Sequence, residues 1–336
     1  MTSSAQTPNE NLNANWRAAL TRGEVESLLE MNDLRSWISI AVTWGLVFAF
    51  FALVVLVPHP VTVVLSLFVI GTRQLGLAVL MHEASHRSLL SNRKLNDWVG
   101  NWLCAYPIWS DLVPYRPYHL KHHAKTGSAE DPDIPLVRPF PITWRSLGRK
   151  AWRDLSGQTG RKFARAAWNR SFGQWRVDPI GRRAAQGALV TNLALLAALA
   201  WIGHPALYLL WVGAWLTTHT LVTRLRSIAE HALTPDPRDP LGNTRTTVAS
   251  WWERLLIAPN RVNYHLEHHL LMTVPHYRLP EMHRLLRERG VLDGACVERG
   301  YWRVIRRAAS RRDETPEARD DDQAEGLSRV NGLQSP

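Results

Sequence analysis

The sequence predicts an all-α integral membrane protein, with four transmembrane helices in two hairpins and a cytoplasmic helical cap that holds a metal site. Three observations predict this fold class: apolar blocks long enough to cross a membrane, an uneven distribution of Lys and Arg, and three clusters of histidine. The chain of 336 residues is long enough for one domain of this kind.

The predicted spans are blocks with little or no formal charge. They cover residues 37–57, 61–80, 184–202 and 206–222. These lengths are close to the ~20 residues that a helix needs to cross the hydrocarbon core of a bilayer. Arg73 is the one charged residue of the second block. Because a charge inside a membrane is costly, we expect its side chain to face the bundle interior and to pair with a polar group.

Lys and Arg are placed asymmetrically between the spans. The turns 58–60 and 203–205 contain neither residue, whereas the segment 145–183 is rich in both. The positive-inside rule therefore predicts a multi-pass protein, here of a bacterial inner membrane, whose termini and metal site are cytoplasmic. The formal charge of +11 is then explained by topology and by contact with anionic lipid head groups. We expect no nucleic acid partner.

The expected domain boundaries follow the same division. Residues 1–30 form a polar N-terminal segment, which we expect to be partly disordered, and residues 31–303 form the membrane domain. Residues 304–336 are rich in Asp, Glu, Arg, Ser and Gly, a composition typical of a disordered tail. Cys104 and Cys296 are too few for a disulfide framework or a cysteine-ligated zinc site, so we expect reduced thiols.

Nine of the 14 histidines form three clusters and one isolated position, all on the predicted cytoplasmic side. Spacings of three and four residues place the members of a cluster on one side of a helix. One zinc ion takes about four ligands, so nine imidazoles predict two metal ions. Imidazole binds iron, zinc, copper and nickel, so the spacing does not identify the metal. The candidate metal ligands are His82, His86, His119, His122, His123, His231, His265, His268 and His269.

Four polar residues beside these clusters are candidates for supporting the ligands. Glu83, Glu230 and Glu267 each adjoin a cluster histidine, and Asn263 lies two residues before His265. A glutamate in this position accepts the second ring N–H of a ligand and fixes its tautomer. The alternative for each glutamate is an ordinary exposed position on a helix. We expect no catalytic residue beyond the metal ligands.

The three clusters read H-x-x-x-H, H-x-x-H-H and H-x-x-H-H, a pattern that resembles the membrane fatty acid desaturase and hydroxylase superfamily. The similarity continues outside the clusters, over roughly residues 35–290, and is to acyl-lipid desaturases. It includes Gly71-Thr-Arg73-Gln74, Asp131-Pro-Asp133 and Asn263-Tyr-His265-Leu-Glu-His268-His269-Leu270.

This resemblance implies a centre of two iron ions held by the nine histidines, with O2 as co-substrate. It also implies desaturation of a fatty acyl chain of a membrane lipid or another acyl substrate. Since no haem-binding domain is evident, we expect an external electron donor such as a ferredoxin or a cytochrome b5-type protein. Stearoyl-type acyl-CoA desaturases usually have one more residue in the first cluster and Asn at the position of Ser227, so an acyl-CoA substrate is disfavoured.

Two alternative activities remain open on the sequence. The same clusters occur in enzymes that hydroxylate or ketolate lipids and carotenoids. A more distant alternative is a membrane metalloprotease, because His82-Glu83-Ala-Ser-His86 also fits H-E-x-x-H. A protease would leave the other two clusters unexplained. A metal transporter would need ligands along a path through the membrane, and only His219 lies within a predicted span.

Overall fold

The computed structural model describes residues 16–169, 172 and 178–312, which are predominantly helical. The outer parts of the two terminal segments that we expected to be disordered, 1–15 and 313–336, lie outside the described residues. In the first half the helices are η1 (Trp16–Ala19), α2 (Arg22–Leu29), α3 (Asp33–Leu56), α4 (Pro60–Ser85), α5 (Arg93–Val99), η2 (Gly100–Ala105), η3 (Tyr106–Ile108), α6 (Leu112–Lys125), α7 (Ile134–Val137), α8 (Trp144–Leu155) and α9 (Gln158–Trp168).

The second half contains further helices and a small sheet. The helices are α10 (Pro179–Trp201), η5 (Pro205–Leu207), α11 (Tyr208–Leu216), α12 (Thr218–His231), α13 (Trp251–Leu256), η6 (Pro259–Arg261), α14 (His265–Leu270), η7 (His276–Arg278), α15 (Leu279–Glu288) and α16 (Tyr301–Ala308). Strands β1 (Thr246–Val248) and β2 (Val297–Arg299) pair in parallel, with Thr246 opposite Val297.

Three helices of the described residues, α3, α4 and α10, are long and apolar enough to cross a membrane. The block 206–222, which we predicted as the fourth span, is divided, because α11 ends at Leu216 and α12 begins at Thr218. Between them Thr217 has φ −123° and ψ −84°, outside the helical region. Its hydroxyl donates to the carbonyl of Gly213 at 2.6 Å. Such bonds from Thr to the preceding turn bend helices, and hydropathy does not detect them.

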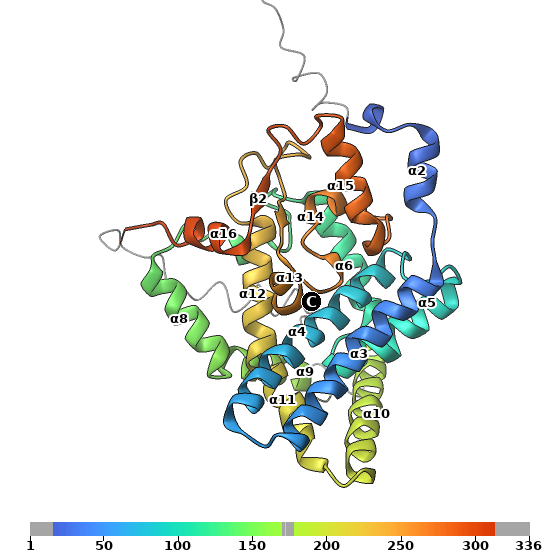
Figure 1. Cartoon of the computed structure of the whole chain (residues 1–336), viewed down its shortest axis with the longest axis vertical. Helices are drawn as coiled ribbons and strands as arrows, with labels where there is room; N and C mark the ends of the chain where they lie inside the picture. Colours follow the sequence, from blue (N-terminus) through green and yellow to red (C-terminus); the bar gives the residue numbers. More distant parts are fainter. Residues whose placement is uncertain (1–15, 170–171, 173–177, 313–336) are drawn as a thin grey trace, which may run out of the picture.

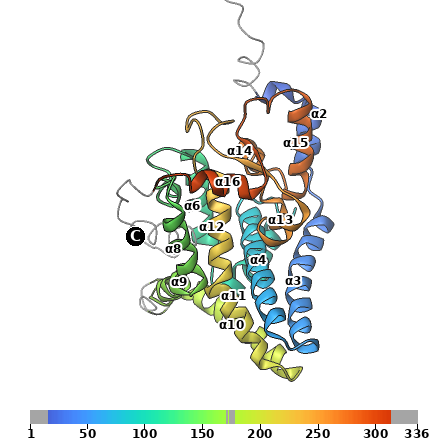
Figure 2. The same cartoon turned by 60° about the vertical axis from the view of Figure 1, so that its left-hand side comes forward.

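The two ends of the molecule contain different elements: short turns at one end and a layer of helices at the other. Both short turns, between α3 and α4 and between α10 and α11, lie at the lower end in Figures 1 and 2. The helices α14, α15 and α2 form a layer at the upper end (Figure 1). Helix α4 runs from the lower turn towards that layer and carries His82 and His86 at its final turn.

Helix α4 is the centre of the packing, in contact with α3, α11 and α12. A Cβ atom at Gly71 would lie 2.2 Å from Thr218 Oγ1, so only glycine allows α4 to approach the junction of α11 and α12 this closely. Arg73 is 5% exposed, and its Nη2 donates to the carbonyl oxygen of Leu255 at 2.6 Å. The expectation that Arg73 faces inward and contacts a polar group is confirmed.

The folded part of the chain extends beyond residue 303, where we expected the membrane domain to end. Helix α16 packs on α12, with Val304, Ile305 and Ala308 buried. These apolar residues are spaced as on one face of an amphipathic helix. The average composition of the segment does not reveal this face, because charged residues lie between the apolar ones. The folded part therefore continues at least to the end of α16, and the expectation of a disordered tail from 304 is wrong for residues 304–308.

Candidate metal centre

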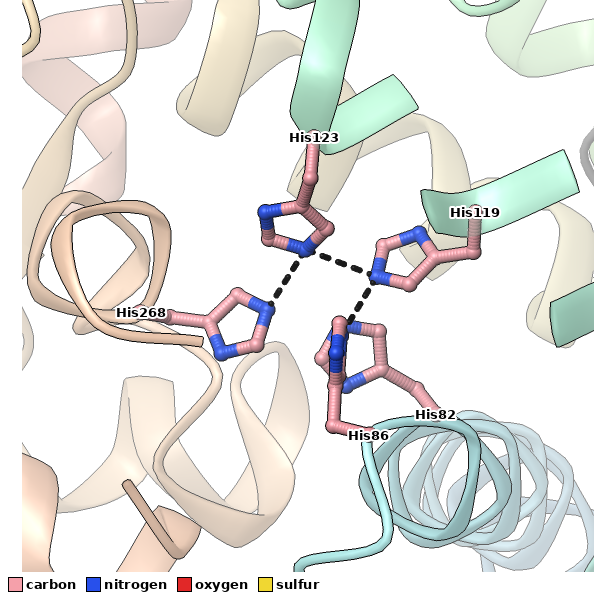
Figure 3. A group of neighbouring side chains, drawn as sticks. All are labelled: His82, His86, His119, His123 and His268. Atoms are coloured by element: carbon pink, nitrogen blue, oxygen red, sulfur yellow. Dashed lines mark hydrogen bonds between the residues drawn. The ribbon is translucent and has the colours of Figure 1, made fainter. Parts of the chain in front are cut away.

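The structure brings all nine candidate ligand histidines together, from four helices, in two groups. Within each group the potential donor atoms all lie within 4.8 Å of one another. The first group contains His82, His86, His119, His123 and His268 (Figure 3). The second group contains His122, His231, His265 and His269. Each H-x-x-H-H cluster is thus divided between the groups, whereas we expected each cluster to act as one set.

Helix geometry explains this division. Successive residues turn by about 100°, so residues four apart point in directions that differ by only about 40°. The pair His119 and His123 therefore stays together in the first group, and His265 and His269 stay together in the second. The middle histidine of each cluster lies three residues after the first histidine. Its direction therefore differs from that of the first by about 60°, in the opposite sense of rotation. It joins the opposite group, which is the case for His122 and for His268.

The spacing of the ring nitrogens fits a metal ion in each group. In the first group the Nε2 atoms of His86 and His119 are 2.9 Å apart, and those of His119 and His123 are 3.0 Å apart. In the second, the Nε2 atoms of His231 and His265 are 2.8 Å apart. Two imidazole nitrogens at right angles about one ion, each about 2.1 Å from it, are about 3.0 Å apart.

Burial also fits a metal-binding role. Both ring nitrogens of His82 are buried without a hydrogen-bond partner among the described residues. Such atoms are costly unless a further group satisfies them. A metal ion does this for one nitrogen of an imidazole, and a donor set of imidazoles suits iron, zinc, copper and nickel.

The electrostatics of the site keep most of the imidazoles neutral, the form that binds a metal. Burial, followed by the charge of neighbouring imidazoles, lowers the pKa of His119, His265, His268 and His269 well below its usual value. The pKa of His231 is lowered well below its usual value by burial and then by His122 and two arginines. These groups do not have to release a proton at neutral pH before they bind a metal.

His122 differs from the other histidines because two carboxylates flank it. Its Nδ1 lies 2.7 Å from Oδ1 of Asp131 and 3.6 Å from Oδ2 of Asp133. Although burial opposes the charged form, these carboxylates raise the pKa of His122. We predicted no role for either aspartate from the sequence. The available signal was two acidic residues shortly after an H-x-x-H-H cluster, within a string that resembles the desaturases.

Glu83 and Glu230 contact ligand histidines in different ways. Oε1 of Glu83 lies 3.4 Å from Nδ1 of His82, and its Oε2 accepts the backbone N–H of His276 at 2.9 Å. Nδ1 of His82 has no hydrogen-bond partner among the described residues, so the support of this histidine by Glu83 stays a prediction. Glu230, however, lies 3.6 Å from Nε2 of His265, the nitrogen that faces His231, and is paired with Arg226. Its carboxylate therefore faces the inside of the second group.

Glu267 and Asn263 support the backbone of α14, and no contact with a cluster histidine is recorded for either side chain within the described residues. Oε1 of Glu267 accepts from Nδ1 of His283 at 2.6 Å, and its Oε2 accepts from the hydroxyl of Thr246. Asn263 donates to the carbonyl of Thr247 at 3.0 Å. These bonds attach α14 to β1 and α15, so both residues position the helix that carries the last cluster.

A small cavity of about 10 Å³ lies between the two groups. Its lining includes His82 and His268 of the first group and His265 of the second. The remaining lining includes the apolar side chains of Val79 and Leu279. The volume is that of about one water-sized probe, so the histidines face a nearly closed space with little room for bulk water.

The comparisons with known proteins agree with this geometry. A model of the family described as fatty acid desaturase matches residues 58–299, which contain all nine histidines. The chain is 26% identical over 239 residues to dihydrorhizobitoxine desaturase of Bradyrhizobium elkanii, covering 66% of each protein. It is 25% identical over 243 residues to sn-1 oleoyl-lipid 12-desaturase of Arthrospira platensis, covering 62% of this chain and 64% of the relative.

A further relative has a different activity in its name. The chain is 29% identical over 113 residues to beta-carotene 4-ketolase of Protosiphon botryoides, covering 33% of this chain and 27% of the relative. The matched part of the chain covers less than two thirds of the length of each of these three relatives. The family model nevertheless covers more than half of the chain, and with it the whole histidine constellation. The chain therefore belongs to the fatty acid desaturase family.

Proposed function

We propose that this protein desaturates a fatty acyl chain of a membrane lipid, with O2 as co-substrate and electrons from an external donor. In this proposal the nine histidines bind two iron ions. The observation that carries it is the convergence of nine imidazoles into two groups with nitrogen spacings of 2.8–3.1 Å. Five donors in the first group are more than the three of a catalytic zinc site, so the metalloprotease alternative has no support in this geometry.

The metal ions and the side chains have separate tasks. When bound, the two iron ions and O2 supply the oxidation of an unactivated C–H bond, which no amino-acid side chain performs alone. The buried, neutral imidazoles hold the ions in place. Asp131 accepts the ring N–H of His122 and so fixes its orientation, while the carboxylate of Glu83 lies 3.4 Å from Nδ1 of His82. Val79 and Leu279 limit the access of water to the space between the groups.

We further propose four membrane crossings, with the divided helix α11–α12 as the fourth and the metal centre on the cytoplasmic side. Support comes from the two short turns at one end of the molecule, from α14 at the other end, which carries the last histidine cluster, and from the many Lys and Arg residues in the sequence between 145 and 183. In a background without native cysteines, His204→Cys should react with a membrane-impermeant maleimide in intact cells, and Arg287→Cys only after permeabilisation. The reverse labelling would contradict this topology.

We propose a lipid acyl chain as substrate because of the names of the relatives and because the sequence differs from that of acyl-CoA desaturases. Relatives named as sn-1 oleoyl-lipid 12-desaturases match 62–77% of this chain, and Ser227 stands where acyl-CoA enzymes of the stearoyl type have Asn. Hydroxylation or ketolation is the second candidate, because a beta-carotene 4-ketolase is also similar over part of the chain.

A lipid profile tests the proposal. Cells that express the wild-type protein are compared by mass spectrometry with cells that express His268→Ala at the same membrane level. We expect acyl chains two mass units lighter, with a new double bond, only with the wild type. A product sixteen units heavier would assign the protein to the hydroxylases. No difference, with a suitable donor co-expressed and carotenoids present, would contradict both candidate activities.

A further inference from the structure

A cleft of about 500 Å³ opens where α3 enters the bundle, between α3, α4, α13 and the turns η6 and η7. Four arginines line it: Arg35, Arg73, Arg254 and Arg261. No carboxylate lines the cleft, and within the described part of the chain no ion pair is recorded for any of the four. Four guanidinium groups around one space repel each other unless an anion lies between them.

Arg73 is the buried member of this set. Its side chain is 5% exposed, and its Nη2 donates to the carbonyl of Leu255. Its Nε is buried without a hydrogen-bond partner among the described residues. A carbonyl satisfies one donor but does not neutralise the charge. A buried guanidinium with an unpartnered donor is costly, and a bound anion removes that cost.

The backbone at the cleft is held in an uncommon conformation. Asn260 and Arg261 have φ of 51° and 62°, in the left-handed region that few residues other than glycine adopt. The side-chain amide of Asn260 donates to the carbonyl of Gly76 on α4 at 2.9 Å, which fixes this turn. Backbone strain of this kind persists where the surrounding structure enforces it and concentrates at binding sites. Here it places Arg261 on the wall of the cleft.

The cleft lining also contains a strip of apolar side chains on α3. Three apolar residues, spaced four residues apart, follow Arg35 along α3, and this spacing places them on one side of the helix: Ile38, Val42 and Leu46. Ile38 and Val42 are 52% and 51% exposed, on the side that a bilayer would cover. The cleft therefore combines a cationic end with an aliphatic strip, which is the complement of an anionic head group on an alkyl chain.

The cleft adjoins the metal centre. Asn260 and His276 line both the cleft and the small cavity between the two histidine groups. His276 Nε2 lies 2.9 Å from the hydroxyl of Ser39 in the cleft, and its backbone N–H donates to Glu83 beside His82. Asn260 and His276 thus line both spaces, so an amphiphile in the cleft lies beside the metal centre.

We propose that this cleft binds the anionic head group, a carboxylate or a phosphate, of the acyl substrate, with the adjoining methylenes on the Ile38–Val42–Leu46 strip. The inference deepens the proposed function and rests on it for the identity of the bound molecule as substrate. It narrows the substrate class to acyl compounds with a negatively charged head group.

Direct binding tests this inference without turnover. The purified full-length protein in dodecyl maltoside is titrated calorimetrically with dodecyl phosphate, with dodecanoate and with zwitterionic dodecylphosphocholine. We expect one of the two anions to bind at least about ten-fold more tightly than dodecylphosphocholine, as charge-assisted hydrogen bonds to two guanidinium groups provide. The better anion shows whether the head group is a phosphate or a carboxylate. Equal affinity for all three compounds would overturn the proposal.

Variants locate the binding. Arg35→Gln combined with Arg254→Gln should weaken the preferred anion at least about ten-fold. Arg287→Gln is the matched control, because Arg287 is exposed on α15, outside the cleft, and should bind as the wild type does. An unchanged affinity in the double variant, or an equal loss in the control, would place the anion elsewhere. His268→Ala should retain binding. If the lipid profile shows no product while this selectivity persists, the proposed reaction fails and the anion site stands.

Discussion

The two histidine groups share helices α6 and α14 but differ in their third helix, which is α4 in the first group and α12 in the second. The first combines two pairs of histidines at i, i+4 spacing, from α4 and α6, with the single His268. The second combines one pair, from α14, with the single residues His122 and His231. The first group therefore offers five imidazoles and the second four. Each H-x-x-H-H cluster contributes to both groups, so neither group forms unless α6 and α14 are correctly placed.

The groups also differ in the charge around them. Asp131, Asp133 and Glu230 lie 2.7 Å, 3.6 Å and 3.6 Å from imidazole nitrogens of the second group. Around the first group only Glu83 has a recorded carboxylate contact within the described residues. Negative charge near a ligand increases its basicity and stabilises a bound cation. We infer that the carboxylates of the second group offset its smaller number of imidazoles.

The largest effect is expected when a ligand is removed from either group. His268→Ala in the first group and His122→Ala in the second should each reduce activity to background, because the proposed reaction needs both ions. Each variant should also lose about one iron ion per chain, measured by elemental analysis of the purified protein. His204→Ala, in the turn at the other end of the molecule, is the control and should keep both. An active His122→Ala variant would show that the second group is dispensable.

A smaller effect is expected for the carboxylates, and it should differ between the groups. Asp131→Asn should lower activity about 10–100-fold, as is usual for the hydrogen-bond partner of a metal ligand. Glu83→Gln should cost less, because its contact with His82 is 3.4 Å rather than the 2.7 Å between Asp131 and His122. Turnover and iron content of the two variants, measured side by side, check this order. The opposite order would refute the inferred difference between the groups.

Removal of the metal should make stability depend on pH. In the metal-free protein burial lowers the pKa of His119, His265, His268 and His269, whereas an unfolded histidine has a pKa near 6.5. Below that pH the unfolded chain binds more protons than the folded one, so stability falls as pH falls. The raised pKa of His122 acts in the opposite direction.

We therefore expect the melting temperature of chelator-treated protein to fall by about 5 °C or more between pH 7.5 and pH 5.5. Differential scanning fluorimetry in detergent measures it. The metal-free variant His265→Ala/His268→Ala provides the comparison and should show a shallower dependence. A melting temperature that rises as the pH is lowered would contradict the buried, neutral state of these imidazoles.

The smallest effect on chemistry is expected for Glu267→Gln. Because Glu267 contacts His283 and Thr246 and not a cluster histidine, the variant should keep its iron content and stay within about three-fold of wild-type activity. Its stability should decrease by about 1–2 kcal/mol, since a buried charge-assisted hydrogen bond is weakened. A loss of iron equal to that of Asp131→Asn would show that Glu267 acts on a ligand after all.

The sequence predicted the ligand histidines, and the structure brings all nine of them together. Local spacing also accounts for the pairs, since His82 and His86 lie on one helix face wherever that helix goes. It also separates the middle histidine of each H-x-x-H-H cluster from the other two, but it does not show which clusters meet. The position of His268 beside His123, with their Nε2 atoms 3.1 Å apart, depends on how α14 packs against α6. The contact of Asp131 with His122 depends in the same way on the turn that follows α6.

The membrane helices illustrate a second limit of the sequence. Hydropathy identified α3, α4 and α10, because a bilayer requires long apolar stretches. It did not identify the break at Thr217, where the hydroxyl of a single residue bonds to the preceding turn. Nor did it identify the cleft, because Arg35, Arg73 and Arg254 lie on three different helices and meet only in the folded protein.

The most direct test of the account is the metal content of the purified wild-type protein, determined by inductively coupled plasma mass spectrometry after expression in iron-supplied cells. The account predicts two iron ions per chain, one for each histidine group, and little zinc. A single zinc ion per chain, or one metal ion bound only by the first group, would contradict a centre of two iron ions.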